Sequence, residues 1–206
     1  MHITIGRRTR ITALGAGLIT AAALALATAG PAAADTADTG GTAVLTMPRT
    51  YFAGIASHGI TLIAGAPATS SYNAGPSTKK SNIADTFTVT GGNGEVSNFY
   101  GIVDLGGAIV AIGQKGATAT ITNLELNFFN GTLTGEINGS TKQVVIADVG
   151  GDLSTSTGTG TETFTATALT TAPAGAKALN TALNTTAFTS GKDLGAFTTT
   201  FDVTIS

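Results

Sequence analysis

The sequence predicts an all-β protein, an antiparallel β-sandwich of about nine short strands with two short helices. Apolar and polar residues alternate with a period of two over most of the chain after Thr86. Two Asn-Gly pairs, at 130–131 and 138–139, are typical of tight turns between antiparallel strands. Helical spacing of apolar residues is confined to two short segments, 47–59 and 173–183.

The first 34 residues have the pattern of a secretion signal: a basic start over 1–10, an apolar run over 11–29 and small residues before Asp35. A membrane-anchoring helix is the alternative, since roughly 20 apolar residues can span a bilayer. Glycines and threonines dilute this run, so we expect a signal peptide (1–34), a disordered leader (35–43) and one folded domain (44–206). Such a protein is secreted, either extracellular or cell-wall associated, with no integral membrane association after cleavage.

The domain is expected to start with a helix inside 47–59, because Pro48 suits a first helical turn and Gly59 a helix end. A short strand at 60–64 and a long polar loop over 68–84 follow. Gly106-Gly107 is interpreted as a two-residue hairpin turn. The long strand after it, 117–129, changes phase at Thr122-Asn123, which predicts a β-bulge.

Asn130-Gly131 is the strongest local signal, because Asn-Gly supplies the positive φ values of a type I′ turn. Pairing Phe129 with Thr132 would place the apolar residues of both strands on one face. The remaining expected elements are a strand at 144–149, a flexible loop at 150–160, a strand at 161–169, a helix at 173–183 and a last strand at 197–205.

The composition excludes several classes of function. The chain has 10 basic and 12 acidic residues, and removal of the signal with its three arginines leaves 7 against 12. A net charge of −5 argues against nucleic-acid binding. There are no cysteines, and His58 is the one histidine beyond the signal. Disulfides, zinc sites and common catalytic triads therefore lack their residues, and we expect no catalytic residues, no metal site and no enzymatic activity.

Tyr51 and His58 are the candidate ligand-binding residues. A separation of seven residues on a helix would place them on nearly the same face, two turns apart. A tyrosine–histidine pair can hold ferric haem. The alternative is structural: Tyr51 packs in the core and His58 caps the end of the helix, where a cation is favoured.

A Thr-x-Thr run at 155–167 is similar to threonine arrays that order water. Such a surface needs several aligned ranks, and the sequence shows one. We interpret the run as the outer face of a β-strand.

Three segments resemble HtaA-type haem-transport domains, which are secreted or cell-surface β-sandwich domains that receive haem. The first is the short N-terminal helix with its tyrosine, and the second is the run GIVDLGGAIV at 101–110 with the long strand that follows. The third is the pattern ALTT…GA.ALN..L…F..G..LG over 168–195. The resemblance spans most of 43–206 and implies the same fold.

The ligand pair of that family has no match here. The family tyrosine follows a serine by four positions, whereas Tyr51 follows Met47, and the segment resembling the family's histidine segment, 101–110, has no histidine. Only Tyr51 carries over as an axial ligand, so the resemblance implies a shared fold with haem binding lost or altered.

Three hypotheses follow from the sequence. The first is a non-enzymatic binding module without a resident cofactor, whose partner is a small apolar ligand between the sheets or a cell-envelope component. The second is a haem carrier that uses Tyr51, with His58 nearby. The third is a structural or adhesive surface protein with threonine-rich sheet faces.

Overall fold

One antiparallel sheet of eleven strands builds the domain. The structure, a computed structural model, describes residues 37–75 and 81–204. Its elements are β1 (Ala37–Pro48), α1 (Arg49–Ala56), β2 (Thr61–Gly65), β3 (Thr69–Asn73), β4 (Asn82–Gly92), β5 (Ile102–Gly106), β6 (Ala108–Ile112), the 3₁₀ turn η2 (Gln114–Gly116), β7 (Thr118–Asn127), β8 (Thr132–Ile137), β9 (Gln143–Thr157), β10 (Thr161–Thr171), α2 (Pro173–Leu183) and β11 (Asp193–Thr204).

Eight of these strands close into a barrel, in the order β7-β5-β4-β1-β11-β10-β9-β8, because β8 pairs back onto β7. The remaining strands extend the wall: β6 and then β2 continue from the first half of β7, and β3 pairs with the first half of β4. The expected all-β, antiparallel class is confirmed, but the two sheets of a sandwich are replaced by one closed sheet. Strands of ten or more residues bend at bulges and continue around the core, so the eight-stranded ring closes on itself, and β2 and β3 are left as the edge strands of the described sheet.

The start of the domain differs from the sequence prediction. Residues 37–43, expected as part of a disordered leader, form the first half of β1, which pairs with β11 and β4. Ala43 and Asp38 are buried there. Positions 35–36 and the expected signal at 1–34 lie outside the described residues.

Gly106-Gly107 is a bend within one long strand and not a hairpin. β5 and β6 run in the same direction and both pair with β7, on either side of the bulge at Thr122-Asn123 that the sequence predicted. Gly107 has φ +112°, and a Cβ there would lie 2.5 Å from Cβ of Ala68. The bend therefore needs glycine because the turn after β2 approaches it closely.

The hairpin at 130–131 exists, but its register differs from the expected one. Asn127 pairs with Thr132, so residues 128–131 form a four-residue loop. Phe129 does not pair with Thr132, because Leu126 lies opposite Leu133 and Phe128 joins the loop, where it packs against Phe164 with ring centroids 5.1 Å apart. Longer strands also replace two expected loops: 68–84 contains β3, and β9 continues through 150–157.

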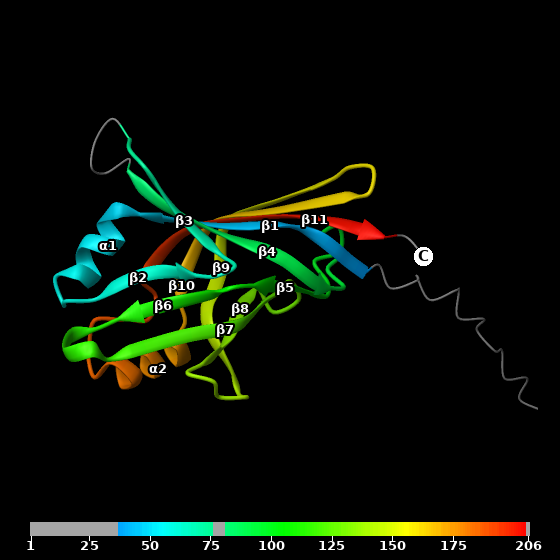
Figure 1. The fold of residues 1–206 in the computed structure, drawn as a ribbon. Coiled ribbons are helices and arrows are strands. Elements are labelled where there is room, and N and C mark those ends of the chain that lie inside the picture. The colour runs from blue at the N-terminus through cyan, green and yellow to red at the C-terminus, as the bar shows by residue number, and fades with distance from the viewer. Residues whose placement is uncertain (1–36, 76–80, 205–206) are drawn as a thin grey trace, which may run out of the picture. The chain divides into compact units, whose positions relative to one another are not determined.

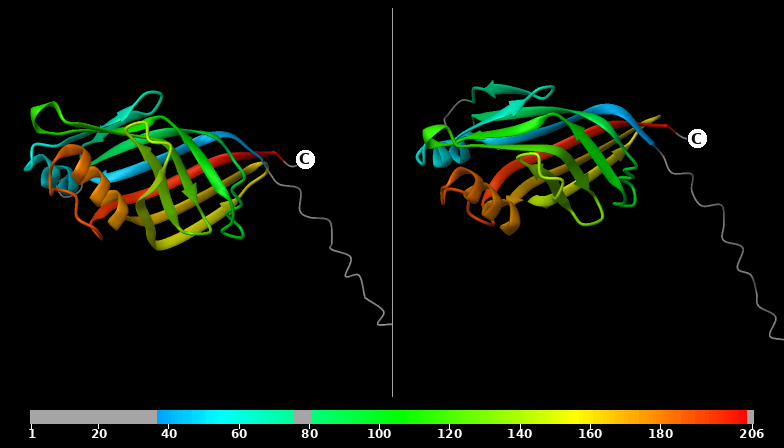
Figure 2. Two further views of the ribbon diagram at one scale, coloured as in Figure 1. Left: turned by 90° about the horizontal axis from the view of Figure 1, so that it is seen from below. Right: turned by 60° about the horizontal axis from the view of Figure 1, so that its bottom comes forward.

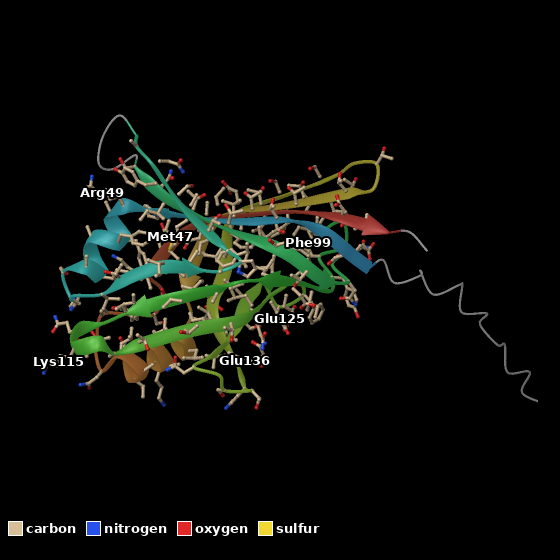
Figure 3. All side chains as sticks on the ribbon, in the orientation of Figure 1. Met47, Arg49, Phe99, Lys115, Glu125 and Glu136 are labelled. Carbon is tan, nitrogen blue, oxygen red and sulfur yellow. The ribbon has the colours of Figure 1, made fainter. Side chains whose placement is uncertain are left out.

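Both helices lie at one end of the barrel, which we call the helix end (Figures 1 and 2). α2 has the predicted bounds, since Pro173 starts it and Ala176, Leu179 and Leu183 are buried. The opposite end, which we call the loop end, carries the β4–β5 connection at 93–101 and the loop at 128–131; Figure 3 labels Phe99 there. None of the described helices has the length and apolarity to cross a membrane.

Candidate functional site

A small apolar cavity at the helix end contains the predicted site residue Tyr51. α1 directs Tyr51 inward, where the side chain is only 6% exposed. The cavity has a volume of about 40 Å³. Its walls come from both helices, seven strands and the connection after α2, with Met47 of β1 labelled in Figure 3; they consist of Leu45, Met47, Tyr51, Leu62, Ile109, Ile121, Ile146, Thr171, Leu179, Phe188 and Leu194.

Two hydroxyl groups are the polar features of this cavity. Burial raises the pKa of Tyr51 to about 12, and a hydrogen bond with the Thr171 side chain offsets only part of this rise. The Thr171 hydroxyl also donates to the carbonyl oxygen of Lys192 at 3.2 Å. Tyr51 is therefore a neutral phenol at physiological pH, fixed in an apolar surrounding.

His58 does not join Tyr51, because α1 ends at Ala56 and His58 lies beyond the helix. Its side chain is exposed and lines a separate, polar groove of about 460 Å³ together with Gln114 and Thr185. The Gln114 side chain donates to the His58 carbonyl oxygen at 3.2 Å. The predicted shared face of the two site residues is thus absent.

Ferric haem is the cofactor that the family resemblance implies, and the residues around Tyr51 do not fit it. Met47 stands where the family has a serine, and the segment resembling the histidine segment contributes the aliphatic Ile109 to the cavity. Small-molecule sites commonly measure roughly 300–1,000 Å³, so the cavity would also have to open. Residues 37–75 and 81–204 contain no group of three His, Asp or Glu side chains that could hold a metal ion.

A second, open groove of about 530 Å³ lies at the loop end, and sequence reasoning missed it. The residues Asn93, Tyr100, Gly101, Ile102, Asn127 and Phe129 line it. Tyr100 and Phe129 are 57% and 75% exposed. The sequence signal for this groove is an aromatic residue in each of two connections, Tyr100 in 93–101 and Phe129 in 128–131. The sequence does not show that these two connections are neighbours, because that depends on the observed strand register.

Two buried carboxyl groups lie inside the barrel wall. Asp38, near the loop end, accepts a hydrogen bond from the Gly94 amide at 2.9 Å, and burial, with Glu162 and Asp104 adding to the effect, raises its pKa to about 6. Asp85 accepts a hydrogen bond from the Ser70 hydroxyl at 2.5 Å, and burial raises its pKa. One oxygen of each carboxyl group has no hydrogen-bond partner among the described residues.

The outer face of the barrel carries more threonine than the 155–167 run predicted. Residues that lie opposite one another across the five neighbouring strands β4, β1, β11, β10 and β9 form a row, which we call a rank, and in one such rank every residue carries a hydroxyl group. In a second rank beside it, only Val44 lacks a hydroxyl group. We call this surface the threonine face; its threonines are Thr42, Thr86, Thr88, Thr163, Thr165, Thr198 and Thr200. Hydroxyl pairs 3.0 and 3.3 Å apart connect β10 to β11 within it.

The sequence matches no protein-family model and no curated protein. The fold is similar to the crystal structure of the C-terminal domain of HtaA from Corynebacterium glutamicum, with a TM-score of 0.55 over 82% of this chain and 99% of that one. The two sequences are 16% identical. The chain therefore has an HtaA-like fold, and this similarity shows the fold alone.

Proposed function

We propose that this protein is a secreted, non-enzymatic binding module, extracellular or cell-wall associated, that takes a small apolar molecule into the cavity around Tyr51. The supporting observation is the cavity wall, which is aliphatic and aromatic apart from the hydroxyls of Tyr51 and Thr171. An apolar ligand leaves no wall group unsatisfied, and a single polar atom on it could pair with the phenol.

α1 is the part of the wall best suited to open the cavity. It has eight residues, and no side chain caps its N-terminus at Pro48. Isolated helices of this length are marginal in water, so α1 depends on the packing of Tyr51 and Ile55 beneath it. Displacement of α1 would expose the cavity and enlarge it.

The test is a titration with the apolar fluorescent probe N-phenyl-1-naphthylamine. Leu62 of β2 is a half-buried cavity residue, and the neighbouring Ile63 is exposed. Leu62→Trp should fill the cavity and abolish saturable probe binding, while Ile63→Trp, which adds the same bulk outside, should leave binding unchanged. Equal binding by both variants, or no saturable binding by the unmodified protein, would contradict the proposal.

A haemin titration, followed by absorbance, tests the haem alternative on the same protein. A one-to-one ferric spectrum that is lost in Tyr51→Phe and kept in His58→Ala would assign haem to Tyr51. The observation in favour of this alternative is that Tyr51, the residue carried over from the family, lines the cavity. The buried, neutral phenol and the aliphatic residues around it make us expect no such spectrum.

A structural or adhesive role is the third candidate, and the threonine face supports it. The two aligned ranks present hydroxyl and methyl groups that could contact the threonine face of a second molecule. Sedimentation should then detect self-association that Thr200→Lys, near the middle of the face, removes and that Thr120→Lys on β7 keeps. A monomer at all concentrations would exclude the self-associating form of this role.

A further inference from the structure

The groove at the loop end has the features of a built binding site, starting with the way its two aromatic rings are held. Glu95 and Tyr100 exchange two backbone hydrogen bonds of 2.8 and 3.1 Å, which close the loop at its base. Phe99 adopts a left-handed backbone with φ 50° and packs edge-on against Phe164, with ring centroids 6.3 Å apart. This uncommon conformation at a bulky residue anchors Phe99 on the core and presents the next residue, Tyr100, at the groove.

Phe129 is held by a similar arrangement from the other side. Its neighbour Phe128 is buried against Phe164 and Phe201, with ring centroids 5.1 and 6.2 Å away. The Asn127 side-chain oxygen accepts a hydrogen bond from the Asn130 amide at 2.9 Å, which fixes the turn. Phe129 is therefore left exposed by an organised loop, and its exposure does not result from disorder of the turn.

Two side-chain amides complete the groove. The Asn93 side-chain oxygen accepts a hydrogen bond from the Ile102 backbone amide at 3.1 Å. In the same way, the Asn127 side-chain oxygen accepts the hydrogen bond from the backbone amide of its own turn. Both oxygens are occupied, so both NH₂ groups are oriented. Neither NH₂ group has a hydrogen-bond partner among the described residues. The groove therefore offers two aromatic rings and two fixed donors, with no charged side chain in its lining.

We infer that this groove binds a sugar ring of a neutral polysaccharide. The negative face of an aromatic ring attracts the weakly positive C–H groups on one face of a pyranose. Sugar hydroxyls can accept hydrogen bonds from the two free amide groups. A purely apolar partner would instead bury both NH₂ groups without an acceptor. An anionic ligand would find no cation among the lining residues.

The experiment follows the side-chain amide signals of Asn93 and Asn127 by NMR during titration with maltohexaose, cellohexaose and mannohexaose. At least one of these neutral oligosaccharides should shift both signals in a saturable manner. Tyr100→Ala and Phe129→Ala should each weaken binding by about tenfold or more, while Tyr100→Phe, which keeps the ring, should bind within about threefold of the unmodified protein. Asn127→Asp keeps the acceptor for Asn130 but removes the donor, and should also weaken binding.

Tyr72 on β3 provides the matched control, because it is 56% exposed and lies outside the groove. Tyr72→Ala should leave sugar binding unchanged.

The inference is overturned if none of the three sugars shifts the two amides at millimolar concentration, or if Tyr72→Ala weakens binding as much as Tyr100→Ala. Concentration-dependent dimerisation that Phe129→Ala removes would also overturn it, since the patch would then serve self-association. The two sites share no lining residue, so probe binding at the helix end should be unaffected by these variants, and this test is independent of the proposed function.

Discussion

The two ends of the barrel treat aromatic side chains in opposite ways. At the helix end, Tyr51 is buried, and its hydroxyl is hydrogen-bonded to Thr171 in a cavity of about 40 Å³. At the loop end, Tyr100 and Phe129 face solvent across a groove of about 530 Å³. The helix end can accept a ligand only if α1 moves, whereas the groove at the loop end is already open. One fold thus presents a closed apolar site and an open aromatic site.

The same substitution at the two ends should have very different effects on stability, and this is the largest effect we expect. Tyr51→Ala removes a buried ring from the core and should lower the free energy of unfolding by about 3–5 kcal/mol. Tyr100→Ala removes an exposed ring and should change it by less than about 0.5 kcal/mol. Urea denaturation followed by circular dichroism measures both values. Similar losses for the two variants would mean that the ends do not differ in packing.

Local sequence signals predicted the helix end better than the loop end. Pro173 and the spacing of Ala176, Leu179 and Leu183 fix α2 through neighbours a few residues apart, so its bounds were predictable. α1 was predicted too long because Gly59 was taken as its end, whereas the helix stops at Ala56. That difference removes His58 from the helical face and separates the two predicted site residues.

The groove at the loop end was not predictable, because it depends on long-range register. A Gly-Gly pair can form a hairpin or a bend, and only the approach of Ala68 shows that Gly107 forms a bend. Asn130-Gly131 favours a two-residue turn locally, but the pairing of Leu126 with Leu133 leaves a four-residue loop, in which Phe128 packs against Phe164. These tertiary contacts place Phe129 beside Tyr100, which is a neighbour only in space.

Buried Asp38 should make the stability of the protein depend on pH. Its pKa is about 6 in the folded protein and about 4 in an unfolded chain, so the folded state binds the proton more tightly. The free energy of unfolding should therefore fall by about 2 kcal/mol as pH rises from about 4 to about 6, after allowance for solvent screening. Denaturation measured across this range tests the sign.

Asp38→Asn isolates this effect. The asparagine oxygen can still accept the Gly94 amide, so the variant should flatten the decline with pH. Some decline should persist, since the pKa values of Asp85 and Glu125 are also raised by burial. The exposed Asp152→Asn is the control and should keep the full decline. A profile that rises with pH in the unmodified protein would contradict the prediction.

Ser70 of β3 connects β2 to β4, and its loss should have a moderate effect. Its hydroxyl accepts the Ala64 amide of β2 at 3.0 Å and donates to Asp85 of β4. Ser70→Ala leaves both partners without this hydrogen bond and should lower the free energy of unfolding by about 1.5 kcal/mol. Both serines are exposed, but the Ser71 hydroxyl makes only a long hydrogen bond of 3.5 Å to the Ala84 carbonyl oxygen, so Ser71→Ala should have almost no effect. Equal losses at the two positions would show that Ser70 does not join β2 to β4.

Glycine-to-alanine substitutions give the smallest expected effect, with opposite signs at the two ends. No atom lies within 4 Å of a Cβ built on Gly54 in α1, so Gly54→Ala should stabilise the protein by about 0.5–1 kcal/mol. A Cβ on Gly94 would lie 2.7 Å from Val103 and 2.8 Å from Phe128, so Gly94→Ala should destabilise it. Both are measured by thermal unfolding.

If α1 must move to admit a ligand, Gly54→Ala should also slow the association of N-phenyl-1-naphthylamine in stopped-flow experiments, because it stabilises the closed helix. An unchanged association rate in a variant with raised thermal stability would place the entrance elsewhere in the wall.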